Sequence, residues 1–362
     1  MATPQAEVVI AVHDPRRQVV RAARSVLDGT KTNTLVTVVC HGKPKEHFAE
    51  LMQFAEQRAG QVRLLEYSDG IASPAGPFNH GLDEAVAPYV AIMGSDDMLE
   101  PGALDAWHGL AASENADFVF AGMKYQNGTT IVNPRVRPWR EKGLDPRKDR
   151  LFERSAPLGL MRTALLRQRS MRLAEGLASG EDIEFTAQLI VAAQRIATAR
   201  KHPKYIIGVD AEERVTAGHY TAAEMLAPLW LIIRSPWFAE LAPDVKASLL
   251  TARLRIAVLA TIARRTTAAE WGEADIDATR EIFTYVTSEA PAALHPLPRS
   301  NRNFIDAILA DGCDAEQAAD AAGQLVAAGQ ADTLLPRKLR YSLHRDGTLV
   351  RYAGYALRRF GA

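Results

Sequence analysis

The sequence predicts an α/β fold with a mostly parallel, doubly wound sheet, followed by a mainly α-helical domain. In roughly the first hundred residues, apolar runs typical of buried strands alternate four times with segments of helical periodicity. From about Thr221 onward, the windows are alanine-rich and amphipathic almost throughout. A chain of 362 residues is long enough for about two domains. We expect them at residues 1–215 and 216–362.

The first alternation is a strand followed by a helix. EVVIAV at residues 7–12 is a continuous run rich in β-branched residues, which suits a strand buried on both faces. In the segment after Pro15, one helical stripe collects the apolar residues, namely Val19, Ala22, Ala23, Val26 and Leu27. Because the strand pattern is followed directly by a helical pattern, we expect a strand–helix unit here.

The same alternation continues along the chain. Strand patterns cover residues 34–42, 62–68 and 89–94, and the segments 45–60 and 78–87 between them are predicted helices. Farther on, residues 116–132 favour a hairpin with a turn at Asn127-Gly128, and residues 134–150 form a polar, proline-punctuated loop. Helices at 162–173 and 181–197 and a late strand at 204–210 complete the domain.

Bulk composition excludes several classes of function. Lys plus Arg and Asp plus Glu number 43 each, so no global field attracts nucleic acid, and we expect no nucleic-acid partner. Cys40 and Cys313 are too far apart in sequence to form a zinc or disulfide motif, which fits a reducing compartment. The sequence lacks a leader-like start and any apolar run of about 18 residues. We therefore expect a cytoplasmic protein.

Polar segments follow each of the first four predicted strands, where ligands bind in parallel sheets. They are HDPRR, CHGKP, SDGIASPAG and SDDMLEP. In the last of these, Asp96 and Asp97 repel one another unless a cation neutralises them, and a divalent cation bound to a nucleotide diphosphate would do so. The alternative is an acidic turn in which Asp97 or Glu100 caps the helix that starts near Pro101.

Several motifs in order resemble the N-terminal domain of inverting family-2 glycosyltransferases with a GT-A fold. The resemblance covers about residues 7–220. Its carriers are VVIAVHDPRRQVVRAARSVLDGT, GIASPAGPFNHGLDEAVAPYVAIMGSDD and GEDIEF. Their combination is far more specific than any single motif.

The resemblance implies roles for three carboxylates and a cofactor, Mn²⁺ or Mg²⁺. Asp96 would hold the donor ribose or contact the metal, Asp97 would be the principal metal ligand, and Asp182 would be the catalytic base. A base is needed because an acceptor hydroxyl is a poor nucleophile until a carboxylate takes its proton. The alternative for Asp182 is a capping box with Ser179 ahead of the helix.

Other matching positions imply nucleotide contacts. Those in the donor site would be His13, Asp14 and Asn79, with Ala11, His41 and Asp69, which follows the third strand, as further candidates. Glu181 and the loosely matching His219 would reach the diphosphate or acceptor. The alternatives are a helix cap for His13-Asp14, a surface turn for Asp69 and a solvated loop for His219. The sequence departs from the family at three points. Ala11 replaces a proline, Gly94 replaces the first aspartate of the acidic motif, and Cys40-His41 replaces a carboxylate that reads the base. Arg135, Arg137 and Arg140 would contact phosphates or else form a solvated face.

The resemblance implies a metal-dependent inverting glycosyltransferase of the hexosyl or N-acetylhexosaminyl class. Its donor would be a nucleotide-diphosphate sugar, with UDP favoured, and its acceptor a glycan or polyol-phosphate polymer of the cell envelope. The alternative is a catalytically lapsed GT-A domain that serves as a binding or assembly module. The basic, aromatic segment at residues 336–362 favours either peripheral contact with the inner face of the membrane, or packing on its own domain or within a homo-oligomer.

Overall fold

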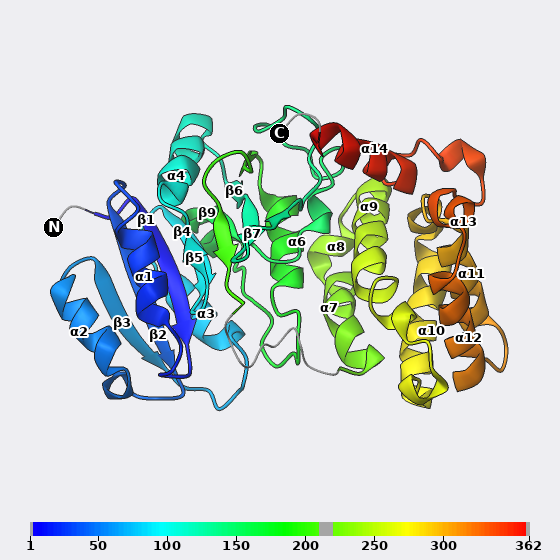
Figure 1. The fold of residues 1–362 in the computed structure, drawn as a ribbon, viewed down its shortest axis with the longest axis horizontal. Coiled ribbons are helices and arrows are strands. Elements are labelled where there is room, and N and C mark those ends of the chain that lie inside the picture. The colour runs from blue at the N-terminus through cyan, green and yellow to red at the C-terminus, as the bar shows by residue number, and fades with distance from the viewer. Residues whose placement is uncertain (1–2, 210–219, 360–362) are drawn as a thin grey trace. The chain divides into compact units, whose positions relative to one another are not determined.

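The computed structural model describes residues 3–209 and 220–359 (Figure 1). The chain divides into two compact units. The first comprises Met1–Asn133, Arg140–Leu144 and Ser155–Ala217, and the second comprises Pro134–Trp139, Asp145–Arg154 and Gly218–Ala362. Unlike a single boundary at residue 215, this division assigns two segments of the proline-punctuated loop to the second unit.

The first unit is built on a seven-stranded sheet with the order β10-β6-β9-β4-β1-β2-β3. Its strands are β1 Ala6–Val12, β2 Thr34–His41, β3 Val62–Tyr67, β4 Tyr89–Gly94, β6 Phe118–Ala121, β9 Gly159–Arg162 and β10 Ile196–Ala199. Only β9 among these strands runs antiparallel to its neighbours, β4 and β6. The predicted mostly parallel α/β sheet is confirmed.

Helices cover the sheet as the apolar periodicity predicts (Figure 1). In α1 (Val19–Leu27), all five apolar residues of the predicted stripe are buried. The other helices of this unit are α2 Ala49–Gln57, α3 Ala75–Asp83, α4 Ala103–Glu114, α5 Thr163–Gln168 and α6 Ile183–Ala192, with a 3₁₀ turn, η1, at Lys45–His47. Trp107 of α4 is buried against the strands, so this helix also anchors the core.

The central strand β1 carries one buried charge. Glu7 is fully buried, and its carboxylate accepts hydrogen bonds from the Thr37 hydroxyl at 2.6 Å and the Val86 N–H at 2.8 Å. It also pairs with Arg63 of β3 at 2.8 Å. A buried carboxylate is tolerated only when its lone pairs are satisfied in this way. Glu7 therefore ties three parallel strands and the α3–β4 connection together.

Two strands of the main sheet were missed by the sequence patterns. The predicted helix at 181–197 ends at Ala192, and residues 196–199 pair with β6 instead. The predicted helix at 162–173 shrinks to α5, which follows directly on β9. Both strands have only four residues, which is too few for a clear period, and pairing in the sheet overrides their local helix propensity.

A second, smaller sheet has the order β5-β11-β7-β8. Its strands are β5 Met98–Leu99, β7 Met123–Tyr125, β8 Thr130–Ile131 and β11 Tyr205–Ile207. The predicted hairpin is present as β7 and β8, with Gly128 at a φ of +88° in the turn. The late strand β11 lies between β5 and β7. It therefore meets the residues that directly follow β4.

The second unit is mainly helical, as predicted. Its α-helices are α7 Ala222–Arg234, α8 Pro236–Ala239, α9 Pro243–Arg253, α10 Glu273–Glu289, α11 Arg299–Leu309, α12 Ala315–Val326, α13 Gln330–Leu334 and α14 Thr348–Arg359. Short turns lie between these helices, namely η5 Ile262–Arg264, η6 Ala268–Glu270, η7 Pro291–Leu294 and η8 Leu339–Tyr341, and η2 Leu151–Glu153 lies in the loop segment of this unit. The apolar window at 245–265 is not one helix, because α9 passes into a π-helical stretch, η4 (Leu254–Val258). No helix in the described ranges meets the length and apolarity that a membrane span requires.

Buried ion pairs hold the loop segments within the second unit. Glu153 is buried between Arg135 at 2.9 Å and Arg351 of α14 at 2.7 Å. Arg137 pairs with the fully buried Asp149 at 2.8 Å. Arg135 and Arg137, which were candidates for phosphate binding or a solvated face, thus pair with buried carboxylates within the second unit.

Gly159 of β9 provides a test of how β9 enters the sheet. Its φ is +145°, and an added Cβ would lie 2.0 Å from the Val119 carbonyl oxygen. Gly159→Ala should therefore lower the free energy of unfolding by about 2–3 kcal/mol or more, because the backbone of β6 would have to move. Urea denaturation of the whole chain would measure the change.

Gly109 is the matched control, because it lies inside α4 and an added Cβ would have no atom within 4 Å. Gly109→Ala should raise stability by about 0.5–1 kcal/mol through helix propensity. Equal stability of the two variants would contradict the close approach at Gly159.

Candidate active site

The parallel register of the central strands brings four polar segments to one sheet edge. Ala11 of β1 lies beside Val39 of β2 and Gly94 of β4, and β2 pairs in turn with β3. Residues that directly follow these strands are therefore neighbours across the carboxyl edge of the sheet, where ligands bind in such folds. Ala11 contributes to this edge at the end of β1, where it is partly buried.

Asp96 and Asp97 converge above Gly94. A Cβ atom on Gly94 would lie 2.6 Å from Asp97 Oδ2 and 3.1 Å from Asp96 Oδ1. Any side chain at position 94 would therefore displace the two carboxylates. Glycine at position 94, where the family pattern has an aspartate, is thus compatible with a functional Asp96–Asp97 pair. It leaves the space that the carboxylate oxygens of both residues approach.

Asp97 is held by two donors, one from the first residue of β11 and one from the residue directly after this strand. The Tyr205 hydroxyl donates to Oδ2, and the Gly208 N–H donates to Oδ1 at 2.8 Å. Tyr205 is itself buried, and its hydroxyl oxygen accepts the Gly94 N–H at 3.2 Å. These contacts fix the orientation of the Asp97 carboxylate relative to β4.

Burial raises the pKa of Asp97 to about 6, and the charge of Asp96 raises it further against the hydrogen bonds from Tyr205 and Gly208. The ionised form is therefore costly near neutral pH unless positive charge is near. Because metal-binding and catalytic groups commonly show such shifts, the raised pKa marks Asp97 as a functional candidate. It also argues against a simple solvated turn.

Asp96 already has cationic neighbours from the start of α1. Arg17 Nη1 lies 3.4 Å from Asp96 Oδ2, and Arg21 donates to the Asp96 carbonyl oxygen at 3.0 Å. Sequence reasoning did not select either arginine. The signal available was the position of Arg17 within HDPRR, directly after a strand end. These guanidinium groups add positive charge where an anionic ligand would sit.

His41 and Asp69, two separate predictions for nucleotide binding, contact one another. His41 Nε2 lies 2.8 Å from Asp69 Oδ1, and the Ile71 N–H donates to the same oxygen at 2.9 Å. Burial alone would raise the pKa of Asp69, but these hydrogen bonds hold it below its usual value. Beside them, Tyr67 stacks on His80 with ring centroids 5.2 Å apart. The cluster offers a fixed carboxylate next to aromatic surface.

His13 and Asp14 follow β1 at the same edge. Asp14 accepts hydrogen bonds from the Arg16 side chain, which lowers its pKa, and from the Arg16 backbone at 2.9 Å. Burial and the charge of Arg17 lower the pKa of His13, so the neutral ring is favoured. Asp14 thus shapes a local turn, and His13 remains exposed as a potential ligand contact.

Asn79 does not present its amide to the strand-end edge. It is 2% exposed, and its Oδ1 accepts the Leu173 N–H at 2.8 Å. Its Nδ2 donates to the Leu173 carbonyl at 3.0 Å and to Glu175 Oε1 at 2.8 Å. The predicted donor contact is therefore replaced by a structural role, in which Asn79 fixes the segment that leads toward Asp182.

Asp182 occupies the N-cap position of α6. The helix begins at Ile183, and the Asp182 side chain makes no capping hydrogen bond. Ser179 is not the N-cap residue of the helix, because α6 begins only at Ile183. The capping alternative for Asp182 is therefore not supported.

Topology places Asp182 toward the same edge as Asp96 and Asp97. Only three residues join α6 to β10, so the helix runs antiparallel to that strand. β10 is parallel to β6, and both β6 and β4 are antiparallel to β9, so β10 and β4 point the same way. The Ala174 N–H donates to the Glu181 carbonyl at 2.9 Å, which closes the loop just before Asp182.

His219, the other predicted diphosphate or acceptor contact, lies outside the described residues.

A divalent cation would depend on its substrate for most of its ligands. In the described portion of the chain, no group of three or more His, Cys, Asp or Glu side chains could hold a metal ion. Asp96 and Asp97 together fit the smaller role of one or two carboxylates that Mg²⁺ commonly uses with substrate phosphates. The converging oxygens and the raised pKa of Asp97 suit such a contact.

Comparisons with known proteins agree with this geometry. Residues 7–172 match the profile of a family described as glycosyl transferase family 2. The chain is similar to the poly(ribitol-phosphate) beta-glucosyltransferase of Bacillus spizizenii, with 18% identity over 201 residues, covering 55% of this chain and 32% of that protein. The chain thus spans about a third of that relative's length.

Solved structures show the same fold. S. aureus TarS 1–349 in complex with UDP-GlcNAc has a TM-score of 0.72 and 16% identity, covering 89% of this chain and 92% of that chain. A longer S. aureus TarS structure has a TM-score of 0.68 and 17% identity, covering 88% of this chain and 55% of that chain. The predicted GT-A fold with a helical C-terminal region is confirmed.

The raised pKa of Asp97 has a stability consequence with a definite sign. A folded pKa of about 6, above the unfolded value of about 3.9, means that ionising Asp97 costs stability increasingly from about pH 4 to 6 and constantly above. Asp97→Asn removes this cost. The variant should therefore gain stability relative to the unaltered chain as the pH rises from 4 to 7, measured by urea unfolding at each pH.

Asp14→Asn should give the opposite sign, because Arg16 lowers the pKa of Asp14 in the folded state. The variant should be less stable than the unaltered chain at neutral pH and approach it in acid. A pH-independent difference for Asp97→Asn would show that its carboxyl group titrates normally.

Proposed function

Since the domain at residues 7–172 belongs to glycosyl transferase family 2, we propose that the chain is an inverting glycosyltransferase. It transfers a sugar from a nucleotide-diphosphate donor to an acceptor hydroxyl. The observation that carries the proposal is the convergence of Asp96 and Asp97 above Gly94 at the strand ends. This arrangement provides negative charge at a ligand-binding edge, and in the described parts of the chain Arg17 pairs with Asp96.

Asp97 is the proposed main contact for Mn²⁺ or Mg²⁺, with Asp96 holding the donor ribose or sharing the cation. Tyr205 and Gly208 orient Asp97 by hydrogen bonds to its two oxygens. When bound, the metal would offset the charge that grows on the departing nucleotide diphosphate. Arg17 lies near Asp96 and adds positive charge on the same side.

Asp182 is the proposed general base. It directly precedes α6, and the direction of this helix brings it toward the carboxyl edge of the sheet. A carboxylate there can take the proton of an acceptor hydroxyl as that oxygen attacks the anomeric carbon. Direct displacement by a single nucleophile inverts the anomeric configuration. Glu181, which precedes it, is a proposed acceptor or diphosphate contact.

The His41–Asp69 cluster is proposed to bind the base of the donor. His41 and the Ile71 N–H orient Asp69, whose carboxylate can accept a base N–H. His13 at the end of β1 would line the same pocket. The S. aureus TarS structure with UDP-GlcNAc supports a UDP-sugar, either a hexose or an N-acetylhexosamine. His41 thus takes a positioning role where the family pattern has a carboxylate.

A polyol-phosphate polymer of the cell envelope is the proposed acceptor, supported by the similarity to a poly(ribitol-phosphate) beta-glucosyltransferase. We place the enzyme in the cytoplasm, at the inner face of the membrane. Near the C-terminus, Leu339, Leu343 and Tyr352 are 62%, 84% and 62% exposed, close in sequence to the basic residues Arg337 and Arg340. Exposed apolar and basic side chains together suit an anionic membrane surface, while a homo-oligomer interface is the alternative.

The binding-module alternative is less well supported. It was suggested by the substitutions at Gly94 and Cys40-His41. Gly94 provides the space in which the carboxylates meet, and His41 fixes Asp69, so neither change removes a necessary group. Hydrolysis of UDP-sugars by the purified chain, followed as UDP release, would distinguish an enzyme from a module.

The Asp182 assignment predicts a turnover defect without a folding defect. Asp182→Asn should lower kcat by about 10²–10⁴-fold, because the amide cannot act as a base, while the Kd for UDP stays the same. The melting temperature should hardly change, since asparagine is as well suited as aspartate to the residue before a helix. The matched control is Asp320→Asn on the exposed side of α12, which should keep full activity. A fully active Asp182→Asn enzyme would remove this residue from the mechanism.

Two variants separate the metal and base contacts in calorimetric titrations with UDP. Asp97→Asn should abolish the gain in UDP affinity that Mn²⁺ provides, because the amide carries no charge to offset the cation. Asp69→Asn should weaken UDP binding with and without Mn²⁺ by the same factor. If Asp97→Asn retained the full Mn²⁺ effect, the acidic pair would not be the cation site.

A further inference from the structure

A small pocket in the second unit is lined by cationic and hydrogen-bonding side chains. Its volume is about 170 Å³, whereas a single water needs roughly 10–15 Å³ by the same measure. It therefore has room for a phosphate group and its neighbouring atoms. The lining residues lie along α9, in and beside η7, in and after η8, and at Arg147 in the loop segment before η2. The polar members of the lining are Arg147, Asp244, Ser248, Thr251, His295, Tyr341, His344, Arg345 and Asp346.

Two donors of this pocket have no partner in the described parts of the chain. The Arg345 guanidinium, which is half-buried, makes no hydrogen bond or ion pair there, although its backbone carbonyl accepts from Arg150 at 2.9 Å. Ser248 is 5% exposed, and its hydroxyl likewise has no hydrogen-bond partner among those residues. Donors without a protein partner are left to water or to a ligand.

Two imidazoles add further donors. His344 Nδ1 accepts the Asp346 N–H at 3.2 Å, so the neutral ring carries its proton on Nε2. His295 stacks on Tyr341 with centroids 4.5 Å apart, which fixes the plane of its ring. Burial and nearby cationic side chains lower the pKa of both histidines. The surroundings of the pocket are therefore rich in positive charge.

The two carboxylates of the pocket are already compensated. Asp244 forms an ion pair with Arg147. Asp346 Oδ2 lies 3.9 Å from His344 Nδ1, and the cations Arg255 and Arg150 also act on it, although burial raises its pKa overall. Arg345 also acts electrostatically on Asp346, but in the described parts of the chain its guanidinium forms no ion pair. The N–H donors of Arg345 therefore remain available to an anion.

We propose that this pocket binds a phosphodiester of the polyol-phosphate acceptor, with Arg345 and Ser248 as the principal donors. A guanidinium presents a fork of N–H donors that matches phosphate geometry, and the hydroxyl and imidazole donors satisfy further oxygens. The proposal rests on the acceptor class given above. In this proposal the helical unit binds the polymer, and the strand-end carboxylates of the first unit take part in the chemical step.

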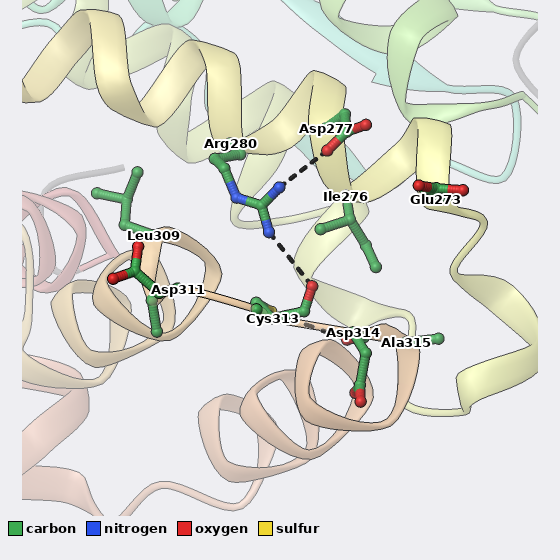
Figure 2. A pocket seen from close by; sticks show the side chains of 11 residues that line it. Glu273, Ile276, Asp277, Arg280, Leu309, Asp311, Cys313, Asp314 and Ala315 are labelled. Atoms are coloured by element: carbon green, nitrogen blue, oxygen red, sulfur yellow. Dashed lines mark hydrogen bonds and ion pairs between the residues drawn. The ribbon is translucent and has the colours of Figure 1, made fainter.

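A second pocket of the same unit illustrates the contrast (Figure 2). Its lining includes four carboxylates, namely Glu273, Asp277, Asp311 and Asp314. Arg280 is engaged there, since it donates to Asp277 at 2.8 Å and to the Cys313 carbonyl at 3.2 Å. The guanidinium in the lining of this pocket is therefore already engaged, and the surrounding carboxylates disfavour an anion.

Calorimetric titration of the whole chain tests the phosphate site. The probes are inorganic phosphate, glycerol phosphate and a short polyol-phosphate oligomer, each without a sugar donor. The oligomer should bind most tightly, and Arg345→Gln should weaken it about tenfold or more, because a charge-assisted hydrogen bond is lost. Ser248→Ala should weaken it less, and Arg345→Lys should retain part of the affinity. Arg169→Gln on the exposed end of α5 is the matched charge control and should bind normally.

Three outcomes would overturn the proposal. The first is a folded Arg345→Gln variant that binds the oligomer as tightly as the unaltered chain does. The second is an oligomer that binds the unaltered chain no more tightly than inorganic phosphate does, and the third is an equal loss of UDP affinity in Arg345→Gln, which would assign the pocket to the donor. In transfer assays, Arg345→Gln should raise KM for the polymer and leave kcat unchanged. Oligomer binding that depends on Arg345 in a chain that transfers no sugar would instead refute the proposed function and leave the pocket intact.

Discussion

The hydrogen bond from Tyr205 to Asp97 links the two sheets of the first unit at the site. Tyr205 lies in the small sheet, 108 residues beyond Asp97, and its buried hydroxyl bonds both the carboxylate and the Gly94 N–H of the main sheet. The position of Asp97 is therefore determined by late strand pairing as much as by its own strand. If β11 were displaced, the acidic pair would lose its shared geometry even with β4 intact. The site thus depends on the completed fold of the unit.

The same contact sets a balance between stability and function. Burial beside Tyr205 raises the pKa of Asp97, so the ionised carboxylate is held in an unfavourable environment. The two hydrogen bonds offset only part of that cost. A ligand that brings positive charge would relieve the remainder and bind more tightly for that reason, since stabilisation and binding are linked. Glu7 shows the opposite solution in the same sheet, because Arg63 and Thr37 compensate its buried charge internally. The contrast distinguishes a structural carboxylate from one available to a ligand.

Local patterns predicted the features that depend on local physics. The continuous apolar runs gave β1, β2 and β4, and the strand ends identified Asp69, Asp96 and Asp97 as candidates. Other features depend on partners that are distant in sequence. Nothing near IATA at residues 196–199 indicates that β6 will accept it as a strand, and nothing near KYII indicates that the tyrosine will bond an aspartate. The buried pairing of Arg135 with Glu153 likewise appears only when the helical unit encloses the polar loop.

Asn79 shows how motifs far apart in sequence become one physical unit. The family resemblance joined an asparagine on α3 to an acidic motif at residues 180–185, without a reason for their association. In the structure, the Asn79 amide bonds both backbone groups of Leu173 and the side chain of Glu175. The hydrogen bond from the Ala174 N–H to the Glu181 carbonyl then fixes the residue before Asp182 relative to this anchored segment. A buried amide can bond a backbone N–H and C=O at once, whereas aspartate could accept but not donate. The requirement for asparagine at position 79 therefore follows from the need to anchor the loop that carries Asp182, which is a stricter condition than contact with a nucleotide.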